Sequence, residues 1–126
     1  MPDNKARLQG KEIYMKRIEA IIRPTKVGRV CTALEKVGHT DLMISQIEGR
    51  GRQNGIRYQL RGKTYNVDLM SRARVEVIVK DREVDEIIKT ISGAVLTGET
   101  GDGEIFIHAM EDAIRIGTGE SGASAV

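Results

Sequence analysis

The sequence contains few of the residues that would indicate nucleic-acid binding, disulfide bonding or membrane insertion. Aromatic residues make up 3% of the 126 residues, and tryptophan is absent. A single-stranded nucleic-acid platform stacks bases on several aromatic rings, so no nucleic-acid partner is expected. Cys31 is the one cysteine, so no disulfide forms within the chain and a cytoplasmic location is expected. No apolar run approaches the ~20 residues of a membrane helix, so no membrane insertion is expected.

The length is that of a single domain, and its positive and negative charges nearly cancel. Charged residues make up 30% of the chain, yet the net charge is only +2, which excludes polyelectrolyte character. The length is typical of one domain with a modest core. The polar first residues, 1–11, do not resemble a signal peptide.

The hydrophobic pattern predicts an α+β fold. Alternation predicts strands over residues 16–23, 42–48, 74–79 and 104–109, and helical spacing predicts helices over 27–37 and 84–95. Asp81 is expected to cap the second helix. The order β-α-β-β-α-β is that of the ferredoxin-like fold, a four-stranded antiparallel sheet with two helices on one face. Residues 1–14 are expected to be a flexible arm, residues 15–116 the domain and residues 117–126 a flexible tail.

The second face of this sheet is expected to be covered by another copy of the chain. Two helices cover only one face, and Ile21, Ile78 and Phe106 should lie on the other. These side chains are too apolar for a fully solvated surface. We therefore infer that self-association buries this face.

Residues 49–65 form a long segment that is expected to be irregular. It contains four glycines and no Asp or Glu. Its basic residues are Arg50, Arg52, Arg57, Arg61 and Lys63. A loop this long inside a small domain is usually functional. One interpretation is a solvated charge run; the other is a docking element for an acidic partner.

Two glycine-rich segments are candidates for binding phosphate. In residues 49–55, glycines let backbone amides approach an anion and Arg52 can bind a phosphate, although a flexible basic loop explains the same pattern. Residues 97–103 contain three glycines and can form an anion-binding nest, or an ordinary turn between helix and strand.

Other reactive residues give no catalytic or metal site. His39 and His108 lack a nearby second ligand, so no intrinsic metal is expected. Cys31 lies on the apolar stripe of the first helix and is interpreted as core. Glu76 is either a specific hydrogen-bond partner or an interface charge. Glu104 is the one candidate base near the expected phosphates, so the chain is not expected to be an enzyme.

Several motifs together resemble the PII signal-transduction family from Met15 to about Glu120. They are residues 16–24 (KRIEAIIRP), 51–53 (GRQ), 61–68 (RGKTYNVD), 97–103 (TGETGDG), 105–106 (IF), 114–115 (IR) and 118–120 (TGE). The resemblance implies a homotrimer of ferredoxin-like subunits with nucleotide clefts between subunits. It also implies a mobile loop that docks onto a transporter or enzyme. No permanently bound cofactor is implied.

The resemblance also implies roles for individual residues at the loop and its base. Gly51, Arg52 and Gln53 match residues at the loop base, where Arg52 would contact phosphate. Gln53 would help to hold a Mg²⁺ ion bound to the nucleotide. Tyr65 matches a loop tyrosine that some members have uridylylated. Arg72 replaces the lysine that binds the carboxylate of 2-oxoglutarate, so Arg72 and Gln53 are candidates for a small-anion effector site.

Further matches define the expected nucleotide site. Glu76 and Ile78 would line the adenosine pocket. The remaining candidates are Gly101, Asp102 and Gly103 in the phosphate-contacting turn, and Arg115, which would contact phosphate.

The sequence departs from the family pattern at cationic positions. Glu104 replaces a lysine and Gly117 replaces an arginine, both expected to face phosphates. Two charges about 4 Å apart interact by roughly 1–4 kcal/mol, so ADP or AMP is expected to bind better than ATP. Ser71 and Arg72 also depart from the pattern, which disfavours 2-oxoglutarate and favours an oxyanion such as bicarbonate. The chain thus resembles an atypical, carboxysome-associated branch; the alternative is an ordinary nitrogen regulator that senses ATP, ADP and 2-oxoglutarate.

Overall fold

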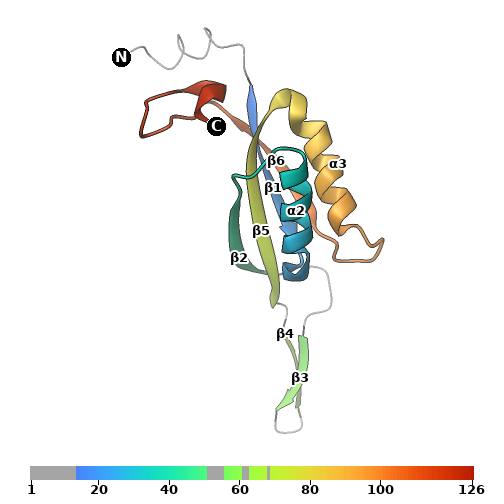
Figure 1. Ribbon diagram of the computed structural model, residues 1–126. Coiled ribbons are helices and arrows are strands. Elements are labelled where there is room, and N and C mark those ends of the chain that lie inside the picture. Colours follow the sequence, from blue (N-terminus) through green and yellow to red (C-terminus); the bar gives the residue numbers. More distant parts are fainter. Residues whose placement is uncertain (1–13, 51–55, 61–62, 68) are drawn as a thin grey trace.

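The computed structural model describes residues 14–50, 56–60, 63–67 and 69–126, and its main layer is a four-stranded sheet (Figure 1). The strands are β1 (Met15–Ile22), β2 (Met43–Arg50), β5 (Leu69–Lys80) and β6 (Glu104–Met110). They lie in the order β2-β5-β1-β6, and every neighbouring pair is antiparallel. Helices α2 (Val27–Lys36) and α3 (Val84–Val95) cover one face. The predicted ferredoxin-like arrangement is confirmed.

The core lies between this sheet and the two helices. Alternate residues of a strand point to the same face, so β1 and β5 each direct one set of apolar side chains toward the helices. Ile18 and Val75 are almost completely buried there. The helices contribute their apolar stripes to the same cluster. The buried helical residues are Val30, Leu34, Ile87, Ile91 and Val95.

Short 3₁₀ turns lead from the strands into the helices. The first turn, η1 (Pro24–Lys26), follows β1, and the second, η2 (Asp81–Glu83), follows β5. The prediction that Asp81 caps the second helix is wrong, since Glu83 precedes α3 and no side chain caps it. The Glu83 carboxylate instead accepts a hydrogen bond from the Lys80 amide at 3.0 Å, and Asp81 forms an ion pair with Lys16 at 2.6 Å.

The segment expected to be irregular contains strands. Strand β2 continues to Arg50, and β3 (Ile56–Leu60) pairs with β4 (Lys63–Val67) in a separate antiparallel two-stranded sheet. Figure 1 shows this hairpin projecting beyond the end of β5, away from both helices. The expectation of an irregular segment over residues 49–65 is therefore wrong for its described part.

The C-terminal segment runs back on itself after β6. Ile114 and Ser121 form an isolated bridge, and a 3₁₀ helix, η3, spans Gly122–Ala125. The Gly122 amide donates to the Ala113 carbonyl and to the Asp112 carboxylate, both at 3.0 Å. The flexibility expected for residues 117–126 stays a prediction. Residues 1–13 of the expected N-terminal arm lie outside the described residues.

Candidate functional site

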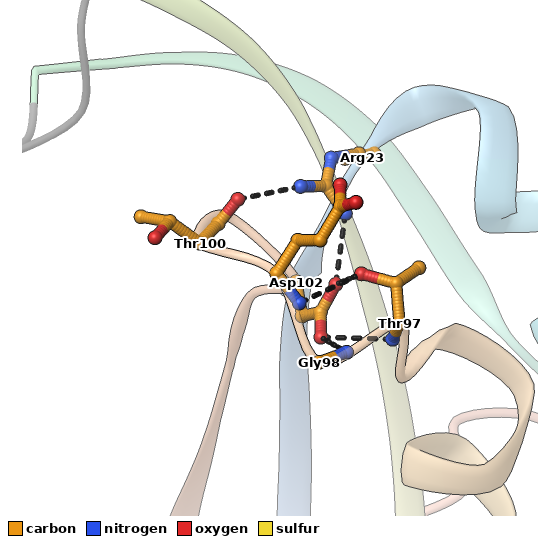
Figure 2. Close-up of polar contacts among 6 residues, drawn as sticks. Arg23, Thr97, Gly98, Thr100 and Asp102 are labelled. Carbon is orange, nitrogen blue, oxygen red and sulfur yellow. Dashed lines mark hydrogen bonds and ion pairs between the residues drawn. The ribbon is translucent and has the colours of Figure 1, made fainter.

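The glycine-rich turn between α3 and β6 is organised around the carboxylate of Asp102. This carboxylate accepts hydrogen bonds from the amides of Thr97 and Gly98, at 2.9 and 3.0 Å, and from the Thr97 hydroxyl. Arg23, at the end of β1, donates to Asp102 at 2.9 Å and to the Thr100 carbonyl at 2.7 Å. Figure 2 shows donor groups of Arg23, Thr97 and Gly98 converging on the Asp102 carboxylate. The turn is thus tied to the sheet by an ion pair.

These contacts keep Asp102 ionised. The hydrogen bonds from the hydroxyl and then the amide of Thr97 lower the pKa of Asp102, and Arg23 and Gly98 add to the effect. Together they outweigh the opposing influence of burial, which leaves the Asp102 side chain 17% exposed.

The glycines of this turn adopt backbone conformations that other residues rarely reach. Gly98, Gly101 and Gly103 have φ angles of +83°, +97° and +122°. A Cβ atom at Gly103 would collide with the carbonyl oxygen of Ile21 in β1. The turn therefore lies tightly against the sheet, in a shape compatible with an anion-binding nest.

A pocket of about 260 Å³ adjoins this turn. The turn and the start of β6 contribute Asp102, Gly103 and Glu104 to its lining. The remaining lining residues are mainly apolar and come from β1, from α3 and the residue that follows it, and from β6. Glu104, expected to repel phosphates, is exposed here beside the turn.

A larger cavity, of about 480 Å³, lies between the loop that follows α2, the last residues of β5 and the C-terminal segment. It brings together Ile78 and Arg115, two of the residues expected to bind nucleotide, with Lys80. His39 Nε2 lies 3.0 Å from Glu83 Oε2 at its edge. Burial raises the pKa of Glu83, but the Lys80 amide and His39 more than offset this, so its pKa is lowered overall.

Glu76 lies outside both of these spaces, on the sheet face that the helices leave uncovered. Arg74 Nε lies 3.8 Å from Glu76 and 3.6 Å from Glu19, and Arg17 lies 3.9 Å from Glu76. His108 Nε2 lies 3.6 Å from Glu19. Within one subunit, Glu76 thus belongs to a network of charges on the open face.

The same face carries the apolar side chains that predicted self-association. Ile21 and Ile78 are partly exposed, and Phe106 is 43% exposed. Phe106 pairs with Glu19 across β1 and β6, so an aromatic ring lies directly beside the charged network.

Arg72 and Tyr65 are the remaining expected site residues that belong to the described part of the chain. Arg72 donates a hydrogen bond to the Ser71 carbonyl at 3.0 Å and contacts the sulfur of Met70 at 3.7 Å. Tyr65 pairs with Tyr58 in the β3–β4 ladder. Gly51, Arg52 and Gln53 lie outside the described residues.

Those expected nucleotide-site residues that the structure describes therefore do not line one common pocket within the chain. Ile78 and Arg115 line one space, whereas Asp102 and Gly103 line another. Sequence reasoning missed Arg23 and Thr97. Thr97 lay within the glycine-rich segment, but nothing in the spacing linked Arg23 to an aspartate 79 residues away.

The described residues form neither a metal-binding cluster nor a membrane-spanning helix. No group of three or more His, Cys, Asp or Glu residues among them could hold a metal ion. Within the same part of the chain, no helix is long and apolar enough to span a membrane.

The fold and the turn define a small α+β protein with a tight glycine-rich turn between α3 and β6, and comparison with known proteins identifies the family. A family model described as nitrogen regulatory protein P-II matches residues 15–120. Nitrogen regulatory protein P-II 2 of Methanothermobacter thermautotrophicus is 45% identical over 114 residues, which cover 90% of this chain and 99% of that protein. The P-II protein of Nostoc punctiforme is 44% identical over 112 residues, which cover 89% of this chain and all of that protein. The chain belongs to the P-II family.

Solved structures agree with this assignment. The chain resembles Arabidopsis thaliana PII bound to citrate, with a TM-score of 0.74, 33% identity and coverage of 90% of this chain and 92% of that one. It also resembles the B. subtilis GlnK–ATP complex, with a TM-score of 0.73, 29% identity and coverage of 90% and 96%. The resemblance inferred from the motifs is confirmed.

Proposed function

We propose that this protein is a cytoplasmic P-II regulator that binds an adenine nucleotide between the subunits of a homotrimer. The observation that carries the proposal is the division of the expected site into two spaces, one with Arg115 and Ile78 and one with Asp102 and Gly103. Each space contains only some of the residues expected to contact the nucleotide. The two sets would come together if the space with Arg115 in one subunit lay against the space with Asp102 in its neighbour.

The uncovered sheet face supports the trimer. Phe106 is 43% exposed beside a network of four charged residues and His108, and a second copy would bury this mixed surface. Nucleotide occupancy would then change the order of the basic segment 49–65, and that segment would dock onto a transporter or enzyme.

The charge of the turn favours the less charged nucleotides. B. subtilis GlnK has been solved with ATP, so the family fold accommodates a triphosphate. Here Glu104 lies exposed beside the turn and Gly117 supplies no cation. We therefore infer that ADP and AMP bind better than ATP, because repulsion from Glu104 grows with phosphate charge.

The effector would be a small oxyanion. Arg72 and Gln53 form the candidate effector site, with bicarbonate favoured as in the carboxysome-associated branch. Gln53 would also contact a Mg²⁺ ion carried in by the nucleotide.

The second candidate function is that of an ordinary nitrogen regulator, which senses ATP, ADP and 2-oxoglutarate and is modified at Tyr65. The relatives' description as nitrogen regulatory proteins favours it.

Isothermal titration of the purified protein separates these candidates. AMP, ADP and ATP, each with Mg²⁺, are titrated alone and with bicarbonate or 2-oxoglutarate. Our proposal predicts that ADP or AMP binds more tightly than ATP and that bicarbonate changes this binding. Joint binding of Mg-ATP and 2-oxoglutarate, with no bicarbonate effect, would establish the nitrogen regulator instead. No binding of any adenine nucleotide would overturn both.

A further inference from the structure

The contacts of Asp102 show that its carboxylate is fully used inside the protein. One carboxylate oxygen accepts from Arg23 and from the Thr97 hydroxyl, and the other accepts from the amides of Thr97 and Gly98. All four donors come from the turn or from the end of β1 (Figure 2). Each is a hydrogen bond to a charged acceptor, which is the strong kind.

Arg23 is equally committed to this turn. One terminal nitrogen donates to Asp102 and the other to the Thr100 carbonyl, so the guanidinium spans both sides of the turn. Its charge is balanced by Asp102 at 2.9 Å. Two of the N–H donors of Arg23 are therefore committed inside the turn, and Asp102, an anion, would repel a phosphate rather than bind it.

The turn is fixed from a second direction at Gly103. The absence of a side chain there lets the backbone approach the Ile21 carbonyl of β1 more closely than a Cβ would allow. Arg23 is the first residue after β1. The segment from Thr97 to Gly103 is thus held against the end of β1 by an ion pair on one side and by close backbone packing on the other.

We propose that Asp102 and Arg23 are positioning residues that preset the glycine-rich turn for the phosphates of a nucleotide. The inference rests on the proposed nucleotide-binding function. It changes the expected role of Asp102 from binding the nucleotide directly to holding the turn in shape. The carboxylate accepts the hydrogen bonds of Thr97 and Gly98. The hydrogen bonds that side chains form around this turn in the described structure involve neither the Gly101 nor the Gly103 amide. A turn already shaped before binding loses less conformational freedom when the ligand arrives.

Asp102→Asn tests this role with minimal change of shape. The asparagine removes the negative charge and replaces one accepting oxygen by an NH₂ group. That NH₂ group would face N–H or O–H groups that now donate hydrogen bonds to Asp102. We expect the dissociation constant for ADP, measured by titration calorimetry, to rise about tenfold or more. Amide hydrogen exchange at Thr97 and Gly98 should also become faster. Asp85→Asn is the matched control, since it removes the same charge from an exposed position in the first turn of α3.

Arg23→Lys provides a second variant that keeps the charge but cannot make both contacts. It should weaken ADP binding as well, whereas Arg29→Lys, at an exposed site on α2, should not. A purely structural role would lower the melting temperature of the variants without changing ADP affinity at temperatures where they are folded.

The outcomes separate the two proposals. If the wild type binds ADP and both Asp102→Asn and Arg23→Lys bind it equally well, the positioning role is wrong while the proposed function stands. If the wild type binds no adenine nucleotide, the proposed function is wrong and the positioning role falls with it.

Discussion

At the scale of single residues, the proposed preference for the less charged nucleotides depends on Glu104. It is exposed at the start of β6, directly after Gly103, and lines the same pocket as Asp102. Asp102 forms an ion pair with Arg23, whereas Glu104 takes part in none of the ion pairs found among the described residues. Its negative charge therefore acts on any phosphate that binds the turn.

Glu104→Lys should shift the preference toward ATP. Replacing a negative by a positive charge near the phosphates should raise ATP affinity relative to AMP about tenfold or more, because ATP carries more charge. The ratio of the two dissociation constants is measured by calorimetry at low salt. Glu111→Lys, exposed just beyond the other end of β6, makes the same charge change and should leave the ratio unaltered. An unchanged ratio in Glu104→Lys would show that Glu104 does not face the phosphates.

At the scale of secondary-structure elements, the apolar stripes of the helices carry the stability of the fold. Ile91 on α3 is 1% exposed and belongs to the core cluster. Ile91→Ala should lower the free energy of unfolding by about 2–5 kcal/mol, since it removes packed methyl groups and leaves a cavity. Ile116 is 99% exposed, so Ile116→Ala should change the free energy of unfolding by no more than about 0.5 kcal/mol. Urea denaturation measures both, and equal effects would contradict this view of the core.

The same stripes explain why most elements could be predicted from the sequence. The 3.6-residue pattern of α3 and the alternation in β1 arise from contacts with one continuous core, so each is visible locally. The β3–β4 hairpin was missed because its strands pair only with each other outside the main sheet, and its basic residues resemble a solvated loop. The Arg23–Asp102 pair could not be predicted, because it depends on how β1 and the turn meet in space.

At the scale of the whole molecule, the open face of the sheet should hold the trimer together. Phe106→Lys should weaken assembly, because it places a charge on the surface that the proposed trimer buries. Sedimentation velocity should show a shift from trimer toward smaller species at micromolar concentration. Thr32→Lys adds the same charge on the exposed side of α2 and should leave the trimer intact. A stable Phe106→Lys trimer would mean that another face forms the contact.

The division of the site between two spaces also belongs to this scale. Sequence reasoning could name Ile78, Arg115, Asp102 and Gly103, but their separation within one subunit became visible only in the fold. A nucleotide that needs both spaces should therefore bind only to the assembled protein. Affinity and oligomeric state are expected to change together.

Native mass spectrometry with ADP tests this central claim most directly, since it reports the number of subunits and of bound nucleotides in the same species. The account predicts a trimer that binds up to one ADP per subunit, and monomers, produced by dilution or by Phe106→Lys, that bind none. Monomers that bind ADP as well as the trimer does, or a trimer that binds no ADP, would contradict a nucleotide site built between subunits.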